Sequence, residues 1–292
     1  MSKKDIYQMV TDKILASLEQ GIIPWERPWS GLADGAFNRF TKRPYSLINQ
    51  CLLEKPGEWA TFKQWESIGG KVRKGEKSSF VVFWKPLPIK EKNKDGEDVE
   101  RIIPFLRYYN VFHISQIDGV EPLEIAQNEL HWDMTADELL DDYTRRENIN
   151  LVYEVGNRAY YSPVTDEIHL PLREQFKTME GFYSTAFHES IHSTMSVHRC
   201  NRVEDRKGKS VKFGSEEYSK EELVAEIGSS FIMHKLGLVT QKEDRNTIAY
   251  IQSWIQVLKR DSKMIVWASS RAEKAAKFIF NETNEEVSED VA

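Results

Sequence analysis

Apolar residues recur at helical spacing along much of the chain, and short β-rich runs interrupt this pattern. The first helix is expected from Ile6 to Leu18, with Gly21 as a suitable stop after it. No proline follows Pro171, which favours a helical remainder. Further helices are expected at about 61–68, 135–143, 179–194, 219–235, 241–260 and 264–280.

Two β-rich runs lie in the first half of the chain, at 79–84 and 102–114. The charged segment around 90–100 separates them and is typical of the tip of a solvated hairpin. In the second half, strands are expected at 151–154 and 167–170. Together with the helices, these runs indicate the α+β fold class.

Pro171 directly follows the second of those short strands. Because proline has no N–H to donate, it limits pairing with a further strand. Residues 168–171 are therefore predicted to form an edge strand, of the kind to which an extended peptide can add.

Residues 116–130 lack clear periodicity and contain the turn-forming Asp118-Gly119 and Pro122, so we place a domain boundary there. Residues 1–120 carry 19 Lys and Arg against 15 Asp and Glu, whereas the remainder carries 21 against 31. Opposite charge suggests two modules with different partners. We expect an N-terminal α+β domain, a linker, a mostly helical C-terminal domain with a small edge sheet, and an acidic disordered tail, at 1–120, 121–130, 131–280 and 281–292.

The composition narrows the class of protein. Of the 292 residues, 40% are hydrophobic and 29% are charged, as in soluble globular proteins. No apolar stretch approaches the roughly 18 residues of a membrane span, and no apolar segment follows the basic pair near the start. Cys51 and Cys200 are the only cysteines, so a disulfide framework is not expected. These features predict a cytoplasmic protein without a membrane partner.

The sharpest chemical motif is His188-Glu189-Ser190-Ile191-His192, an H-E-x-x-H sequence within an expected helix. Residues i and i+4 share a helix face, so both imidazoles can point at one metal ion. Glu189 would then lie beside the open coordination position, where a carboxylate can accept a proton from water.

A zinc site with an open position needs a third protein ligand. Glu222 and Glu226 share a face of a later expected helix and can supply one ligand and one carboxylate that holds a histidine N–H. This layout resembles the gluzincin type of zinc peptidase, which implies Glu222 as the ligand and Glu226 as its support, with exchanged roles left open. His198, ten residues after His188, is the alternative third ligand. Zinc suits a site with two histidines and one glutamate, and manganese and iron remain alternatives.

The first half of the chain interleaves basic and aromatic residues. Lysine and arginine can neutralise phosphates, and aromatic rings can stack on bases of a single strand. The alternative interpretation is that the aromatic residues form the core and the basic turns are merely solvated. The candidate DNA-binding residues are Arg39, Lys42, Arg43, Tyr45, Lys71, Arg73, Lys74, Lys77 and Arg107.

A series of ordered motifs in this half resembles the N-terminal domain of ArdC-type antirestriction proteins, which also begins the TraC-type plasmid primases. In the second half, the H-E-x-x-H motif and the segment from Tyr218 to Glu226 are similar to the zincin-like domain of the same family. The N-terminal motifs are Pro24-Trp25, Pro28-Trp29, Pro44-Tyr45, Ile48-Asn49, Trp59-Ala60-Thr61-Phe62-Lys63-Gln64, Gly69-Gly70-Lys71-Val72-Arg73-Lys74-Gly75-Glu76-Lys77 and Tyr109-Asn110-Val111-Phe112-His113.

The resemblance implies a protein of a plasmid or phage that binds single-stranded DNA and protects incoming DNA from host restriction during transfer. Its C-terminal domain would be metallopeptidase-like. The alternative is an active zinc endopeptidase that cleaves a host DNA-associated or defence protein and uses the N-terminal domain to find DNA. In that case Glu189 would be the general base, and Tyr218 a candidate to stabilise the oxyanion.

Overall fold

The computed structural model describes residues 5–26, 35–92, 98–123, 135–202, 216–238 and 244–282, and within them the side chains outside 86–104, 216–217 and 244–250. It confirms the α+β class. The helices are α1 (Ile6–Glu19), α2 (Leu47–Leu52), α3 (Phe62–Ser67), α4 (Ala136–Glu147), α5 (Met179–Ser193), α6 (Glu216–Lys235), α7 (Asp244–Arg260) and α8 (Met264–Ile279). Short 3₁₀ turns lie at Pro24–Glu26, Ile114–Gln116 and Arg173–Gln175.

The strands form three small sheets. The first has the order β1-β2-β5-β4, the second pairs β3 with β6, and the third has the order β7-β9-β8. The strands are β1 (Ala36–Asn38), β2 (Gly57–Ala60), β3 (Lys71–Val72), β4 (Ser79–Lys92), β5 (Asp98–His113), β6 (Ile117–Asp118), β7 (Asn150–Glu154), β8 (Tyr160–Ser162) and β9 (Glu167–Pro171).

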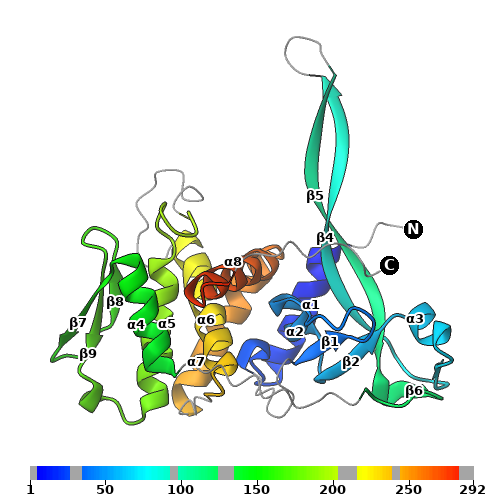
Figure 1. Cartoon of the computed structure of the whole chain (residues 1–292), viewed down its shortest axis with the longest axis horizontal. Helices are drawn as coiled ribbons and strands as arrows, with labels where there is room; N and C mark the ends of the chain where they lie inside the picture. The colour runs from blue at the N-terminus through cyan, green and yellow to red at the C-terminus, as the bar shows by residue number, and fades with distance from the viewer. Residues whose placement is uncertain are drawn as a thin grey trace.

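The predicted hairpin is present and longer than expected. β4 and β5 pair in antiparallel register from Ser79 opposite Val111 to Lys92 opposite Asp98. The outer part of this ribbon extends away from the body of the molecule (Figure 1). Its base packs in the core, where Val81, Val82 and Leu106 are buried.

The predicted position of the strand at 168–171 is wrong. β9 lies in the centre of its sheet, parallel to β7 and antiparallel to β8. Pro171 is compatible with this position because it is the last paired residue, opposite Glu154, where one missing N–H ends the ladder without interrupting it. The edges of this sheet are β7 and β8.

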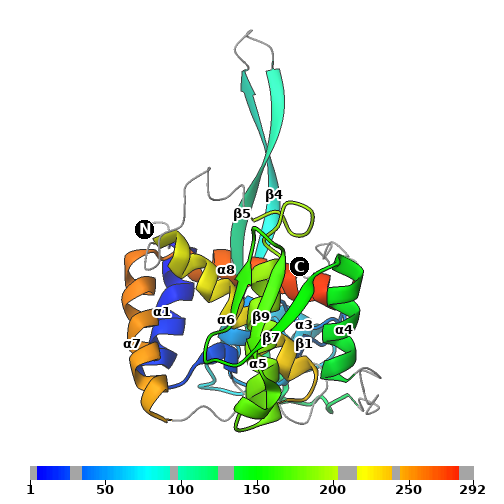
Figure 2. The same cartoon turned by 90° about the vertical axis from the view of Figure 1, so that its left-hand side faces the viewer.

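The two halves of the sequence share one hydrophobic core. α1 packs beside α7, and α2 packs against α8 (Figures 1 and 2). Within the described residues, four hydrogen bonds join positions more than 200 apart: Thr11 Oγ1 to Ser262 O at 2.8 Å, Leu47 N to Glu273 Oε2 at 3.0 Å, Ser230 Oγ to Trp25 O at 2.6 Å, and Lys259 Nζ to Glu19 Oε1 at 3.0 Å. The buried cluster therefore runs without a break from α1 to α8.

Apolar burial explains α2, which the sequence pattern does not predict. All six residues from Leu47 to Leu52 are buried, including Asn49 and Gln50. Asn49 Nδ2 donates to Val82 O at 2.8 Å, and Gln50 Nε2 donates to Ala36 O at 2.8 Å. A helix buried on every side has no polar face, so it leaves no amphipathic pattern in the sequence. Among the described residues, no helix has the length and apolar character of a membrane span.

Candidate metal centre and nucleic-acid surface

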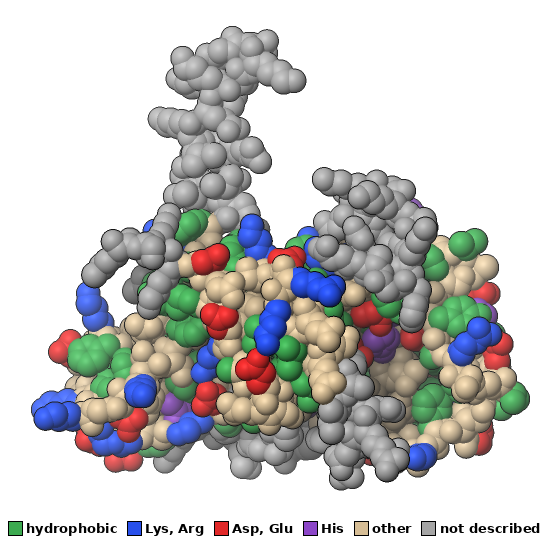
Figure 3. Space-filling view, turned by 180° about the vertical axis from the view of Figure 1, so that it is seen from behind, with side chains coloured by type: hydrophobic (Ala, Val, Ile, Leu, Met, Phe, Trp, Pro, Cys, Tyr) green, Lys and Arg blue, Asp and Glu red, His purple; other side chains and the backbone are tan. Residues whose placement is uncertain are grey.

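α5 and α6 together build a cluster of metal-binding groups. α5 begins after Thr178, whose Oγ1 accepts a hydrogen bond from Gly181 N at 3.1 Å. α6 lies against α5, and Gly228 permits the close approach, since a Cβ there would meet Ile191 Cδ1 at 2.7 Å. On the face seen in Figure 3, histidine and acidic side chains lie in a recess over this region.

The structure brings His188, His192 and Glu222 together. The two Nε2 atoms are 3.2 Å apart, and oxygens of Glu222 lie 3.5 Å from His188 Nε2 and 3.4 Å from His192 Nε2. Zinc–ligand bonds of about 2.0–2.1 Å in a tetrahedron would separate ligand atoms by about 3.3 Å. The donor set and its spacing therefore fit a divalent metal. Among the described residues, this is the one group of three or more His, Cys, Asp or Glu side chains whose ligand atoms all lie within 4.8 Å of one another.

Each histidine has a carboxylate near its other ring nitrogen. Glu226 Oε1 lies 3.8 Å from His188 Nδ1, and Glu221 Oε1 lies 3.5 Å from His192 Nδ1. A carboxylate at Nδ1 favours the proton on that nitrogen and leaves Nε2 free to bind a metal. Glu226 is the carboxylate that the sequence analysis expects beside a histidine N–H or as the alternative ligand, whereas Glu221 has no assigned role there.

Glu221 is itself held by a buried arginine. Arg202 donates from Nη2 and Nε to the two Glu221 oxygens, at 2.6 and 3.2 Å. Both side chains are almost fully buried. The sequence offers little sign of this pair, because Arg202 lies 19 residues before Glu221 and belongs to no metal-binding motif.

The negative charge of the cluster changes the protonation of its members. Burial alone would lower the pKa of His192, but hydrogen bonds to Glu221 and Glu222 outweigh it and raise that pKa to about 10. Burial would raise the pKa of Glu222, yet the two histidines hold it well below its usual range. In the same way, His192 and Arg202 lower the pKa of Glu221 to about 2. In the metal-free cluster, the positive charge of protonated His192 thus offsets part of the negative charge of Glu221 and Glu222.

The two predicted catalytic residues lie beside this cluster. Glu189 is buried on α5, and its charge raises the pKa of both His192 and Tyr218. Tyr218, on α6, is half-buried next to Glu222, and desolvation and that carboxylate raise its pKa to about 12. Tyr218 therefore keeps its proton and can donate a hydrogen bond near neutral pH.

The alternative ligand His198 does not join the cluster. It lies exposed in the turn after α5, near Asp166, whose pKa it helps to lower. Met195, at the position where a glycine would ease a sharp turn, is buried with ordinary backbone geometry. The chain instead makes its left-handed turn at Asn201, with φ of 50°.

The candidate DNA-binding residues fall into two groups. Seven are exposed: Lys42, Arg43, Lys71, Arg73, Lys74, Lys77 and Arg107. Arg73 also pairs with Glu76 at 3.2 Å and with Asp118 at 3.5 Å. The other two are internal. Tyr45 is only 6% exposed and packs on Phe83. Its ring is therefore not open for stacking on a base, contrary to the expectation from the sequence.

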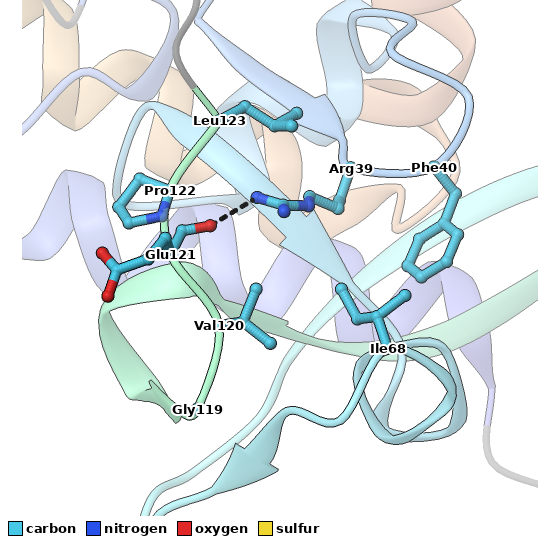
Figure 4. A pocket seen from close by; sticks show the side chains of 8 residues that line it. All are labelled: Arg39, Phe40, Ile68, Gly119, Val120, Glu121, Pro122 and Leu123. Carbon is cyan, nitrogen blue, oxygen red and sulfur yellow. Dashed lines mark hydrogen bonds between the residues drawn. The ribbon is translucent and has the colours of Figure 1, made fainter.

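Arg39 is held within the fold rather than presented to solvent. It forms an ion pair with the buried Glu58, donates to Glu121 O at 3.1 Å and lies over the Trp65 ring at 5.8 Å. It lines an open cavity of about 630 Å³, where its guanidinium points toward the Glu121 backbone oxygen (Figure 4). The lining residues are Arg39, Phe40, Ile68, Gly119, Val120, Glu121, Pro122 and Leu123.

Phe40 is an aromatic residue that lies between the basic candidates Arg39 and Lys42 in the sequence. It is 39% exposed and lines the cavity opposite Val120 (Figure 4). Asn38 fixes its loop, since Asn38 Oδ1 accepts from Phe40 N at 2.9 Å and from Thr41 N at 3.0 Å. Lys42 follows in the left-handed region, with φ of 55°, and is exposed together with Arg43.

Comparison with known proteins divides the chain as its motifs do. Residues 4–112 match the model of the N-terminal domain of the anti-restriction factor ArdC, and residues 138–271 match the model of a zincin-like metallopeptidase. Two DNA primases TraC of Escherichia coli are 32% and 33% identical over 98% and 95% of this chain. The chain spans only 20% and 27% of those primases. Protein y4eC of Sinorhizobium fredii is 30% identical over 93% of this chain and 90% of its own length.

Solved structures extend the match to the whole chain. The metal-free antirestriction ArdC protein from the R388 plasmid superposes with a TM-score of 0.70 and 33% identity, covering 96% of this chain and all of that one. Its Mn(II)-bound structure gives a TM-score of 0.71 at the same identity, covering 95% and 98%. The chain belongs to the family of ArdC antirestriction proteins.

Proposed function

We propose that this protein is an antirestriction protein of a mobile element, which binds single-stranded DNA and protects incoming DNA from host restriction in the cytoplasm. The observation that carries the proposal is the match to the R388 ArdC protein over nearly the whole length of both chains. The exposed cations of the first half supply the charge that phosphates require.

The loop from Asn38 to Arg43 is our proposed centre of DNA contact. Its exposed Lys42 and Arg43 follow Phe40 by two and three positions, so phosphates and a base could be held by neighbouring residues. Lys71, Lys74, Lys77 and Arg107 are further exposed candidates, whereas Arg39 would act by holding this loop and Tyr45 by packing beneath it.

Binding is tested with labelled oligonucleotides. Fluorescence anisotropy at several salt concentrations should show tighter binding to a single strand than to its duplex, with affinity falling as salt rises. The variant Lys42→Ala/Arg43→Ala should weaken binding across sequences and flatten the salt dependence by about two ions. Equal binding of both forms of DNA, or none at low salt, would contradict this part of the proposal.

Protection is tested in cells. A plasmid with restriction sites is transferred into a restricting host, with and without the protein, and a non-restricting host serves as the control. Antirestriction is supported if the protein raises the number of transconjugants in the restricting host and leaves the number in the non-restricting host unchanged. Equal numbers with and without the protein would contradict it.

We further propose that His188, His192 and Glu222 hold a divalent metal, with zinc as the first candidate and manganese and iron as alternatives. A metal bound there would supply Lewis-acid activation of water or a carbonyl group. Of the chain's own residues, Glu189 could accept a proton, and Tyr218 could donate a hydrogen bond to developing negative charge.

Peptidase activity against a host defence protein is the alternative function, and Glu189 separates the two. Glu189→Gln removes the proton acceptor while keeping the shape of the side chain. If protection of transferred DNA survives in this variant, proteolysis is not the mechanism. If protection is lost while folding, metal content and DNA binding persist, the peptidase function is supported.

A further inference from the structure

Behind the metal centre lies a buried ion pair between Arg202 and Glu221. Arg202 is 3% exposed, and Glu221 is 6% exposed. We propose that Glu221 and Arg202 are positioning residues, which hold His192 so that its Nε2 faces the metal. The inference rests on the metal centre proposed above, and it assigns a role to two residues outside the ligand set.

The first step of the argument is the contact between Glu221 and His192. Glu221 Oε1 lies 3.5 Å from His192 Nδ1, while His192 Nε2 faces His188 and Glu222. A neutral imidazole carries one proton, and a carboxylate beside Nδ1 keeps it there. The lone pair then remains on Nε2, on the side where a metal would bind.

The second step is the bidentate pairing of Arg202 with Glu221. A buried carboxylate needs a partner, and two parallel N–H donors fix its plane as well as its charge. The distances of 2.6 and 3.2 Å match this arrangement. Glu221 is thus prevented from turning away from His192.

The third step is that the same guanidinium is attached to the end of α5. Arg202 donates to Ile191 O at 2.8 Å and to Thr194 Oγ1 at 2.6 Å. Ile191 directly precedes His192. One rigid fork therefore links the terminus of the helix that carries His192 to Glu221 on α6, which a lysine could not do with a single nitrogen.

The chain offers a matched control in Arg199. This arginine is also buried, leaves the same turn and donates to Ser193 O at 3.0 Å. Its carboxylate partners are Asp166, with contacts of 2.8 and 2.7 Å, and Glu147, at 3.3 Å, and neither is a candidate metal ligand. Arg199 and Arg202 thus both donate hydrogen bonds to backbone oxygens near the end of α5. Only Arg202 also binds a carboxylate that contacts a metal-facing histidine.

The test measures zinc affinity of the full-length protein by competition with a chromophoric chelator. We expect Glu221→Gln to weaken zinc binding about 10- to 100-fold, because the amide would present N–H groups either to Arg202 or to His192. Arg202→Lys should weaken it less. Arg199→Lys should lower the melting temperature yet leave the zinc dissociation constant within about twofold.

A second readout reports geometry rather than stability. Long-range ¹⁵N–¹H NMR of the zinc-loaded protein should show His192 protonated at Nδ1, and Glu221→Gln should broaden or shift that signal. If Glu221→Gln does not fold, Glu221→Asp, which keeps the charge on a shorter arm, replaces it. Folded variants with unchanged zinc affinity and an unchanged His192 signal would overturn the positioning role. Absence of zinc binding by the unchanged protein would instead overturn the metal centre, and the positioning role with it.

Discussion

At the scale of single residues, Phe40 makes the clearest prediction for the first half of the chain. Phe40→Ala should weaken single-stranded DNA binding about 5- to 150-fold, because a base stacked on an aromatic ring contributes about 1–3 kcal/mol. Phe62→Ala is the control, since Phe62 is 52% exposed but packs edge-on against Phe112 outside the cavity. Fluorescence anisotropy with one oligonucleotide compares the affinities of both variants. An equal loss of affinity in the two would contradict a specific stacking role of Phe40.

The raised pKa of His192 predicts how metal binding depends on pH. With a pKa of about 10, His192 is protonated at pH 7 in the metal-free protein, and a metal must displace that proton. Affinity should therefore rise with pH, by about tenfold per unit between pH 6.5 and 8.5 for one released proton. Calorimetry in buffers of different ionisation enthalpy counts the protons, and a flat profile would contradict the assignment.

Sequence reasoning predicts single residues well where a motif fixes their spacing. His188, His192 and Glu222 come together because residues i and i+4 share a helix face and α6 lies alongside. Arg202 and Tyr45 show the limit of such reasoning. Whether an arginine turns inward to a carboxylate, or a tyrosine is buried, depends on tertiary packing that no local pattern records.

At the scale of elements, the contact between α5 and α6 predicts a coupled pair of substitutions. A Cβ at Gly228 would meet Ile191 Cδ1 at 2.7 Å and Cγ1 at 3.0 Å. Gly228→Ala should therefore lower the free energy of unfolding by about 1–3 kcal/mol through this overlap. The higher helix propensity of alanine offsets about 1 kcal/mol of that loss. Ile191→Val removes the nearest atom. In urea unfolding the double variant should lose less than the sum of the single ones, whereas strict additivity would show that the helices move apart without strain.

The same scale separates the elements that sequence predicts from those that it does not. The helices with one polar face and the hairpin β4–β5 were anticipated, because each carries a clear period of apolar residues. α2 has no polar face, and β1 and β2 have only three and four residues. Pro171 predicts an edge strand, but β9 is central, because at the end of the ladder the missing N–H interrupts no pairing.

At the scale of the whole molecule, the shared core predicts that the two halves unfold together. Calorimetry of the full chain should give one transition, and zinc at 100 times its dissociation constant should stabilise the whole protein by about 2.7 kcal/mol. Residues 131–292 alone would expose the faces of α7 and α8 that cover α1 and α2, and should aggregate. Two separate transitions, or a soluble and folded fragment, would contradict this expectation.

Sequence alone favours two domains because the break in periodicity near 116–130 is visible, whereas the docking of α1 and α2 on α7 and α8 is not. An apolar face that packs on a distant helix has the same pattern as one that packs within its own domain. The hydrogen bond from Thr11 to Ser262 O, for example, joins residues 251 positions apart, and no sequence motif links the two.

The shared core also bears on how such genes evolve. A recombination that passed on only one half would leave an exposed apolar surface, so selection should favour inheritance of both halves as a single cassette. The TraC primases agree with this expectation, since the segment similar to this chain corresponds to 98% and 95% of it although it makes up 20% and 27% of their lengths. In both primases the similarity therefore extends across the two halves of this chain.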